Sequence, residues 1–331
     1  MPDIWLDCDP GHDDAAAIIL AGYHPGSRLL GVSTVNGNAS LHNATQNALR
    51  VLSAAGLDKD VKGVFPGASK PLVRQAAACI MIHGSSGLDG TDGQPLFPET
   101  DLPVCDQEPA ICAMYQTIKS TYSSTGSRQK VQLVCTGPLT NAALLISVFP
   151  DVVEMVDIVL MGGSMAEGNT GPVAEFNIQV DPEAAQIVFS SAAHVTLVPL
   201  QVTHTAVATE AVLDRIKAGP PPAAAFLRII VDMLTFFAST YRTAFGFPDP
   251  PVHDPCAVAY ALRPELFQTK RMRVDVEMAS PLSLGQTVCD VWGSTGRPPN
   301  VNIALSMDVE QFWTDMIAAF HLAGQRSPLK P

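Results

Sequence analysis

Short runs of apolar and β-branched residues alternate with longer segments of helical periodicity through most of this chain. The runs are almost free of polar residues, which is typical of strands buried on both faces of a sheet. Strands that alternate with helices in this way form a mostly parallel sheet flanked by those helices. We therefore predict an α/β fold with a Rossmann-like central sheet, whose main strands are 3–7, 29–35, 131–135, 156–161 and 195–200.

Helical patterns follow most of the predicted strands. Two acids open the segment 13–23, and acids favour a helix N-terminus. Gly219-Pro220-Pro221-Pro222 separates the patterns 209–218 and 223–245, because such a run cannot continue a helix. The other predicted helices are 42–56, 109–123, 138–149, 181–192, 254–263 and 308–323.

Residues 271–306 have a different pattern, in which short strand-like segments are separated by turns. The segments are 271–278, 286–292 and 300–306. Strands joined by turns pair antiparallel, so we predict a small antiparallel appendage near the C-terminus. The chain shows no internal repeat and no convincing linker, and we predict one domain over residues 1–331.

The formal net charge of −12 makes nucleic acids and anionic membranes poor partners, because an acidic surface repels phosphate groups. A neutral ligand or a divalent cation fits this charge better. Apolar stretches are interrupted before they reach the roughly eighteen residues that a membrane span needs. We therefore expect neither a nucleic-acid partner nor a membrane segment.

The cysteines are dispersed and form no CxxC pair. An odd, dispersed set is typical of buried free thiols in a reducing compartment, and not of disulfides or a zinc site. The first residues also lack the basic and apolar segments of a signal peptide. We expect a cytoplasmic protein with free thiols at Cys8, Cys79, Cys105, Cys112, Cys135, Cys256 and Cys289.

Four carboxylates follow the first predicted strand within eight residues, in the segment DCDPGHDD at 7–14. They are Asp7, Asp9, Asp13 and Asp14, and they would repel one another unless a cation compensated them. Oxygen ligands at this density favour calcium or magnesium over zinc. The alternative is a solvated acidic turn in which Asp13 and Asp14 cap a helix. Asp254 is the best remote ligand, although His253-Asp254-Pro255 is also a common way to begin a helix.

Other polar residues lie at or just beyond the ends of the predicted strands. The carboxyl ends of parallel strands share one edge of a sheet, where ligands bind in open α/β folds. We therefore expect one crevice to gather the residues Asp7, Asp9, Asn36, Asn38, Thr136, Gly162-Gly163 and Thr203.

The segment DCDPGHDD resembles the DxDPGxDD signature of the inosine–uridine-type nucleoside hydrolases, which is a highly specific motif. The resemblance then continues in order through nearly the whole chain. Its further motifs are TVNGN at 34–38, CTGPLTN at 135–141, MGG at 161–163, Asn169, AEFN at 174–177, DPEAA at 181–185 and VHDP at 252–255.

The resemblance implies hydrolysis of the N-glycosidic bond between ribose and a nucleobase. Asp9, Asp14, Asp254 and the carbonyl oxygen of Thr136 would hold one Ca²⁺, with Asp7 supporting from close by. The ion would acidify and orient a water molecule, and Asp9 would act as general base. His253 resembles the general acid that protonates the leaving base, and an imidazole that titrates near neutrality suits this task.

The resemblance also implies how the nucleoside is bound. The ribose would contact Asp13, Asn38, Asn169, Glu175 and Asn177. Apolar walls would come from Met161 and Phe176, and His83 would lie near the base. Relatives are dimers or tetramers, which implies a homodimer or homotetramer here.

Two segments depart from the family pattern. Ser86 replaces the usual acid of the HGxDGLG element in the loop 83–90, and the segment 241–252 has no evident family pattern. Because this loop is rich in Gly and Ser, the alternative for His83 is an exposed loop residue. Both departures concern recognition of the base, so the sequence does not predict which base is preferred.

Two other functions compete with the hydrolase. In a haloacid-dehalogenase-like phosphotransferase, Asp7 would be the nucleophile and Mg²⁺ the cofactor, but Asp13, Asp14 and His253-Asp254 would have no role. In a ribose- or calcium-binding protein without catalysis, the intact Asp9 and His253 would be unexplained.

Overall fold

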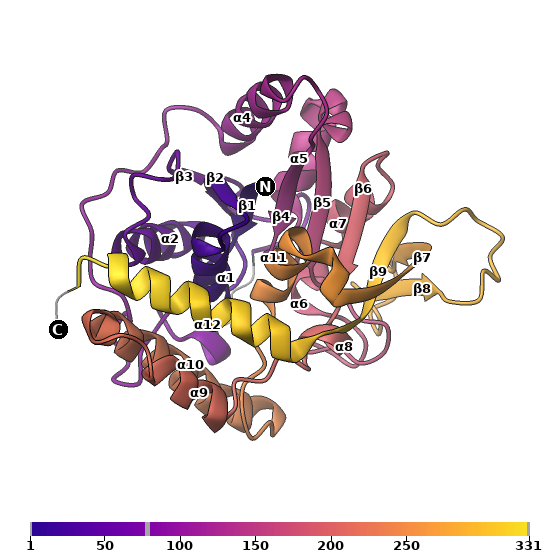
Figure 1. Cartoon of the computed structure of the whole chain (residues 1–331). Coiled ribbons are helices and arrows are strands. Elements are labelled where there is room, and N and C mark those ends of the chain that lie inside the picture. The colour runs from indigo at the N-terminus through magenta and orange to yellow at the C-terminus, as the bar shows by residue number, and fades with distance from the viewer. Residues whose placement is uncertain (1, 77–79, 330–331) are drawn as a thin grey trace.

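The computed structural model describes residues 2–76 and 80–329. Within these residues one sheet of nine strands runs in the order β3-β2-β1-β4-β5-β6-β9-β7-β8 (Figure 1). The strands from β3 to β9 in this order are parallel to their neighbours. The parallel strands that precede the C-terminal part are β1 (Asp3–Cys8), β2 (Arg28–Thr34), β3 (Val64–Pro66), β4 (Val131–Cys135), β5 (Val156–Met161) and β6 (His194–Val198).

The five strands predicted from their apolar runs are confirmed within two residues at each end. β1 is buried along its whole length and β4 at all but one residue, as expected for a sheet covered on both faces. Only β3 was missed, because three residues at the edge of a sheet are too short to give a period.

The antiparallel strands near the C-terminus are confirmed, and they continue the central sheet. They are β7 (Phe267–Val276), β8 (Thr287–Asp290) and β9 (Val301–Met307). β9 pairs in parallel with β6 and antiparallel with β7, so it joins the two parts of the sheet. The hairpin of β7 and β8 projects from the body of the molecule in Figure 1.

Every predicted helix is present, with ends that differ by a few residues. The long ones are α1 (His12–Tyr23), α2 (Leu41–Ala55), α4 (Ala110–Ser124), α5 (Thr140–Val148), α7 (Pro182–Phe189), α9 (Glu210–Lys217), α10 (Ala224–Phe245), α11 (Asp254–Leu262) and α12 (Val309–Arg326). Short helices were missed, because four or five residues show no helical period: α3 (Ile80–His83), α6 (Phe176–Val180) and α8 (Leu200–Thr203).

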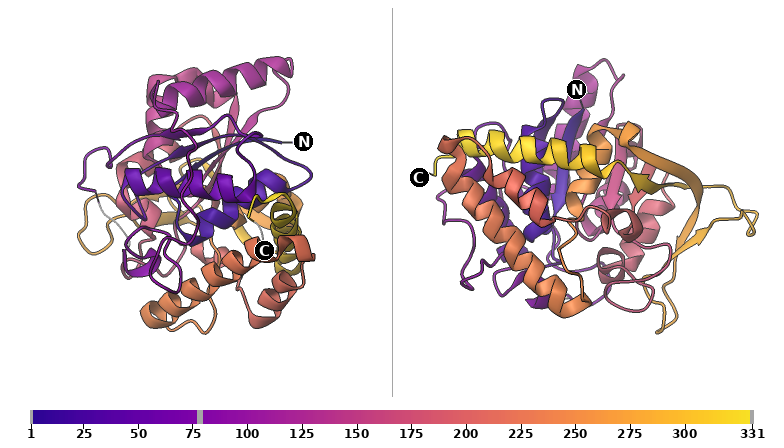
Figure 2. Two further views of the ribbon diagram at one scale, coloured as in Figure 1. Left: turned by 90° about the vertical axis from the view of Figure 1, so that its left-hand side faces the viewer. Right: turned by 60° about the horizontal axis from the view of Figure 1, so that its bottom comes forward.

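The helices form two layers with an apolar core on each side of the sheet. Side chains of α1, α2, α10, α11 and α12 build one core, and those of α4, α5 and α7 build the other. Figure 2 shows the first layer from two sides, with the long helices α10 and α12 packed together. The free thiols are confirmed for the described cysteines, of which Cys8, Cys135 and Cys256 are buried, whereas Cys79 lies outside the described residues.

One helical segment, Pro221–Phe245, is long and apolar enough to cross a membrane by length and composition alone. One face of this segment packs into the protein. That face carries Phe226, Leu227, Ile230, Met233, Leu234, Phe237 and Tyr241. A core helix passes the same test of length and composition, and this packing is that of a core helix.

Asn141, at the start of α5, connects three neighbouring strand ends. Its side-chain amide donates to Asp7 Oδ1 (2.8 Å) and to the carbonyl oxygen of Thr34 (3.0 Å), and it accepts from the backbone N–H of Ala68 (2.8 Å). The residue is fully buried. Its three bonds therefore hold together the ends of β1 and β2 and the chain after β3.

Asn141→Ala should destabilise the fold, because three polar groups around it each lose one hydrogen bond. We expect the free energy of unfolding to fall by about 3 kcal/mol. Urea denaturation at a fixed calcium concentration measures this change. Asn43→Ala is the control, because the Asn43 side chain makes one hydrogen bond at the surface, 3.4 Å long, to the carbonyl oxygen of Ser85. Equal stabilities of the two variants would contradict the bracing role of Asn141.

Candidate active site

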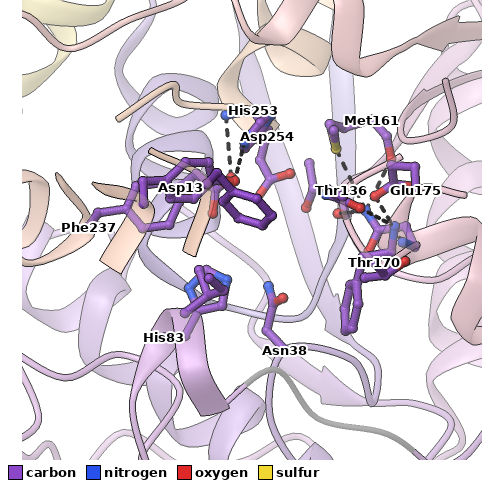
Figure 3. A pocket seen from close by; sticks show the side chains of 16 residues that line it. Asp13, Asn38, His83, Thr136, Met161, Thr170, Glu175, Phe237, His253 and Asp254 are labelled. Carbon is purple, nitrogen blue, oxygen red and sulfur yellow. Dashed lines mark hydrogen bonds between the residues drawn. The ribbon is translucent and has the colours of Figure 1, made fainter. Parts of the chain in front are cut away.

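A pocket opens at the carboxyl edge of the sheet, where the predicted residues converge (Figure 3). The residues expected in this crevice that do not line it are Asn36, Gly162-Gly163 and Thr203, together with Asp7, Asp9 and Asp14, which are fully buried. The predicted residues that line it are Asp13, Asn38, His83, Thr136, Met161, Asn169, Glu175, Phe176, Asn177, His253 and Asp254.

Acids from opposite ends of the chain meet at this pocket. Asp13 and Asp14 lie in the first turn of α1, and Asp254 begins α11. One carboxylate oxygen of each lies within 4.8 Å of those of the other two, and all three residues are buried. The sequence expectation paired Asp14 and Asp254 with Asp9, whereas in the structure Asp13 completes this group and Asp9 lies next to it.

Asp9 is enclosed by backbone, because glycines stand on two sides of its carboxylate. A Cβ atom on Gly37 would lie 2.0 Å from Asp9 Oδ2, and one on Gly137 would lie 2.5 Å from Asp9 Oδ1. Oδ2 accepts a hydrogen bond from the backbone N–H of Asn38 (2.6 Å). Oδ1 is buried and has no hydrogen-bond partner. A buried carboxylate oxygen without a partner indicates a missing proton or cation.

Burial and mutual repulsion oppose ionisation of these acids. Burial, and next the charge of Asp14, raise the pKa of Asp13 to about 7 and the pKa of Asp9 well above its usual range. The pKa of Asp254 is raised in the same way, by burial and then by Asp13. No Lys or Arg is among the described residues that line the pocket. The donor set is all oxygen, so these residues fit a hard divalent cation.

Thr136 and Asn177 connect the acids to the other side of the pocket. The Thr136 hydroxyl donates to Asp14 Oδ1 (2.7 Å), and the Thr136 carbonyl oxygen accepts from Asn177 Nδ2 (2.7 Å). A carbonyl oxygen has two lone pairs, so one is left for a second partner. Thr136 can therefore serve the cation and hold Asn177 at the same time.

Glu175 and Asn169 are oriented by the backbone around α6. Glu175 is the N-cap of α6, and its carboxylate accepts from the backbone N–H groups of Asn177 (2.9 Å) and Gly163 (2.8 Å). Asn169 Oδ1 accepts from the backbone N–H of Phe176 (2.9 Å). These bonds fix polar side chains that line the pocket together with the acids.

The rest of the pocket is aromatic and comes mainly from α10. Figure 3 shows Phe237 and His83 together at one side, and Met161 and Glu175 at the opposite side. No family motif falls on α10, so its pocket residues were not predicted from the sequence. The signal that could have found them is the spacing of Phe237, Tyr241 and Phe245, which are four residues apart and so share one helix face. The lining residues that were missed are Ile82, Thr170, Phe237, Tyr241 and Phe245.

His253 is bonded through both ring nitrogens. Nδ1 lies 2.8 Å from the Thr203 hydroxyl, and Nε2 lies 2.6 Å from the Tyr241 hydroxyl. Burial, and next the neighbouring His204, lower the pKa of His253 to about 3. The expectation of an imidazole that titrates near neutrality is therefore wrong for this ring, because the sequence does not show its burial.

His83 is a buried residue of α3, and this excludes the alternative of an exposed loop residue. The loop that follows is organised by Asp89. The Asp89 carboxylate accepts from the backbone N–H groups of Ser85 (2.7 Å) and Ser86 (3.2 Å) and from the Ser86 hydroxyl. The Ser86 departure thus leaves an ordered loop with its own internal bonds.

Asp7 is fully buried and does not line the pocket. Its Oδ1 accepts from the Ser33 hydroxyl (2.5 Å) and from Asn141, and burial raises its pKa to about 7. A nucleophile needs access to its substrate, so this position removes the basis of the phosphotransferase alternative. Asp7 instead supports the strand ends beneath the acids.

Comparison with known proteins agrees with this geometry. Residues 4–314 match the family model described as inosine-uridine preferring nucleoside hydrolase. A probable ribonucleoside hydrolase of Dictyostelium discoideum is 42% identical over 319 residues, which are 96% of this chain and 93% of the relative. An inosine-uridine preferring nucleoside hydrolase of Leishmania major is 40% identical over 97% of this chain and 98% of its own.

Solved structures show the same fold. A purine-preferring ribonucleoside hydrolase from Gardnerella vaginalis superimposes with a TM-score of 0.86 at 27% identity, covering 98% of this chain and 99% of its own. A plant nucleoside hydrolase superimposes with a TM-score of 0.83 at 27% identity, covering 96% and 98%. The match extends over nearly the whole chain, and the chain belongs to the family of inosine-uridine preferring nucleoside hydrolases.

Proposed function

We propose that the protein hydrolyses the N-glycosidic bond of ribonucleosides and releases ribose and a free nucleobase. One observation carries the proposal: acids from both ends of the chain meet at a pocket that aromatic side chains also line. The polar lining suits ribose hydroxyl groups, and the aromatic lining suits a planar base. Relatives named as ribonucleoside hydrolases at about 40% identity support the same activity.

We infer that the resident cation is Ca²⁺, held by Asp14, Asp254, Asp9 and the carbonyl oxygen of Thr136. Calcium accepts six to eight oxygen ligands, so ribose hydroxyls and water could complete its coordination. When bound, the ion supplies acidification and orientation of a water molecule. The unpartnered Asp9 Oδ1 and the absence of basic residues from the described pocket lining support this assignment.

The protein's own carboxylates would bind the sugar, activate the attacking water and stabilise the charge that develops. Asp9 Oδ1 has no partner and can accept a hydrogen from the attacking water, as a general base does. Asp13 and Glu175 line the pocket and would bind ribose hydroxyls together with Asn38, Asn169 and Asn177. Their negative charge would also stabilise the positive charge that builds on the sugar during cleavage.

The leaving base needs a hydrogen, because it would otherwise depart as a poor anion. In our proposal protonated His253 is the donor: Nε2 gives its hydrogen to the Tyr241 hydroxyl, which passes its own hydrogen to the base and leaves His253 neutral. Both residues line the pocket. Met161 and Phe176 would form the walls, with His83 beside the base.

Several expectations from the sequence stay predictions. They are a single domain over residues 1–331, a cytoplasmic location, a homodimer or homotetramer, and the absence of nucleic-acid and membrane partners. The preferred base is also open, since the relatives' names include pyrimidine-specific, inosine-uridine preferring and purine-preferring enzymes.

Incubation with uridine, inosine and p-nitrophenyl phosphate tests the activity directly. We expect ribose release from the nucleosides, abolished by a calcium chelator and restored by added calcium. Phosphate release would instead support the phosphotransferase, and ribose binding without turnover would support a binding protein.

Asp9→Asn should retain the fold but lower kcat by about 10²-fold to 10⁴-fold, because it removes a general base while keeping the side-chain volume. Ribose release and a thermal unfolding curve measure the two effects. Asp157→Asn is the control, since Asp157 lies at the amino-terminal end of β5, away from the pocket. Near-normal turnover of the Asp9 variant would exclude it as base.

His253→Ala should reduce the hydrolysis of inosine far more than that of p-nitrophenyl riboside, whose leaving group departs without a proton. We expect a loss of about 10²-fold or more in kcat for inosine, the size of a missing general acid. Steady-state kinetics on both substrates measure the ratio. Equal losses on the two substrates would assign His253 a structural role instead.

Calcium should stabilise the folded protein more at about pH 7.5 than at about pH 5. In the protein without a cation burial raises the pKa of Asp13 to about 7, whereas an unfolded aspartate titrates near 4. The folded form thus binds more protons between these values, and its stability falls as pH rises through them. Bound calcium favours the charged form and offsets that loss. Melting temperatures with calcium and with chelator at both pH values test this, and a difference that shrinks toward high pH would contradict it.

A further inference from the structure

His12 belongs to the acidic motif but has no part in the proposed chemistry. Its ring is fully buried at the start of α1 and stacks on Phe236 and Phe237, with centroids 4.8 Å and 5.4 Å away. Its third neighbour is His83, whose centroid lies 5.4 Å away. No carboxylate among the described residues bonds the His12 ring, so it is held as a neutral imidazole.

The carbonyl oxygen of Asp89 decides which ring nitrogen of His12 carries the hydrogen. Nε2 lies 2.9 Å from the carbonyl oxygen of Asp89, which can only accept, so Nε2 must donate. A neutral imidazole has one N–H, and Nδ1 of His12 is therefore an acceptor. Nδ1 of His83 lies 3.1 Å from it. Two lone pairs would repel at this distance, so His83 Nδ1 must be the donor.

A second donor, the backbone N–H of His12, also points at Nδ1 of His83. The backbone N–H of His12 lies 3.4 Å from His83 Nδ1, a longer contact than the one between the rings. The first N–H groups of a helix have no partner within the helix and can remain unbonded or bind water. If His83 accepted this hydrogen, the two Nδ1 lone pairs would face each other. The hydrogen bond between the two rings therefore decides that Nδ1 of His83 donates and Nδ1 of His12 accepts.

His83 has no freedom to turn this nitrogen away. A Cβ atom on Gly11 would lie 2.5 Å from His83 Nδ1, so the ring packs directly against the backbone before α1. Among residues 2–76 and 80–329, no protein group bonds Nε2 of His83, and the residue lines the pocket. The nitrogen left for a ligand is therefore Nε2, without a hydrogen.

We propose that His12 is a positioning residue that makes His83 a hydrogen-bond acceptor toward the nucleobase, so that the pocket selects bases with an N–H at their edge. Uracil and hypoxanthine carry such an N–H, and N-methylation removes it. This inference rests on the proposed nucleoside hydrolysis. It gives the loop of Asp89 a function as well, because the Asp89 carbonyl oxygen orients His12.

A nitrogen NMR spectrum of the calcium-loaded protein with isotope-labelled histidine tests the polarity without any turnover. The His83 signals are assigned by their loss in His83→Phe. We expect a hydrogen on Nδ1 of His83 and none on Nε2. A hydrogen on Nε2 would overturn the inference, whatever the enzyme's activity.

Kinetics of His12→Phe test the consequence for selection. Phenylalanine keeps the stack but removes the acceptor, which leaves the backbone N–H as the one partner of His83 Nδ1 and reverses the polarity. The native enzyme should prefer uridine over 3-methyluridine, and inosine over 1-methylinosine, by about tenfold or more in kcat/KM, and the variant should lose this preference. His24→Phe, at the other end of the same helix, is the matched control and should keep it.

p-Nitrophenyl riboside separates this inference from the proposed function. If none of the proteins hydrolyses this compound or the nucleosides, the proposed function fails. If they hydrolyse it and His12→Phe keeps the native preference for the unmethylated bases, the inference about His12 fails alone. Should the variant not fold, the nitrogen spectrum of the native protein still decides.

Discussion

The repulsion between buried carboxylates is the constraint on which this structure depends. Asp13 and Asp14 at the start of α1 face Asp254 at the start of α11, at the other end of the chain. Burial alone would keep such acids protonated, and their proximity increases that tendency. In our proposal a divalent cation resolves the conflict, and the same charges then serve a reaction in which the sugar becomes positive. The carboxyl edge of a parallel sheet brings these acids together, because loops and helix N-termini converge there.

The residues around the acids hold them in place. Gly37 and Gly137 allow the backbone to close around Asp9, and Asn141 holds the strand ends from which the acids project. Thr136 links the acids to Asn177 and so to the opposite wall. The polar side of the pocket is thus one bonded network, whereas the aromatic side is attached through α10 and α3. This division explains how relatives with one type of chemistry can have names that specify different bases.

The sequence predicted the strands well because buried parallel strands are continuous apolar runs, and it predicted the acid cluster because four carboxylates stand close together in the chain. It could not show which acids meet, since a helix turn places Asp13 beside Asp254 and leaves Asp9 behind them. The low pKa of His253 also depends on burial that no local pattern reveals. The pocket residues Phe237, Tyr241 and Phe245 were not predicted, because a helix face that packs and a helix face that lines a pocket have the same period.

A crystal structure of the calcium-loaded protein with a ribose analogue, with anomalous scattering to identify the metal, tests the central claim most directly. We predict one calcium peak about 2.4 Å from carboxylate oxygens of both Asp14 and Asp254, next to the ribose hydroxyls. The account is contradicted if no calcium lies between these two residues, or if the sugar binds elsewhere.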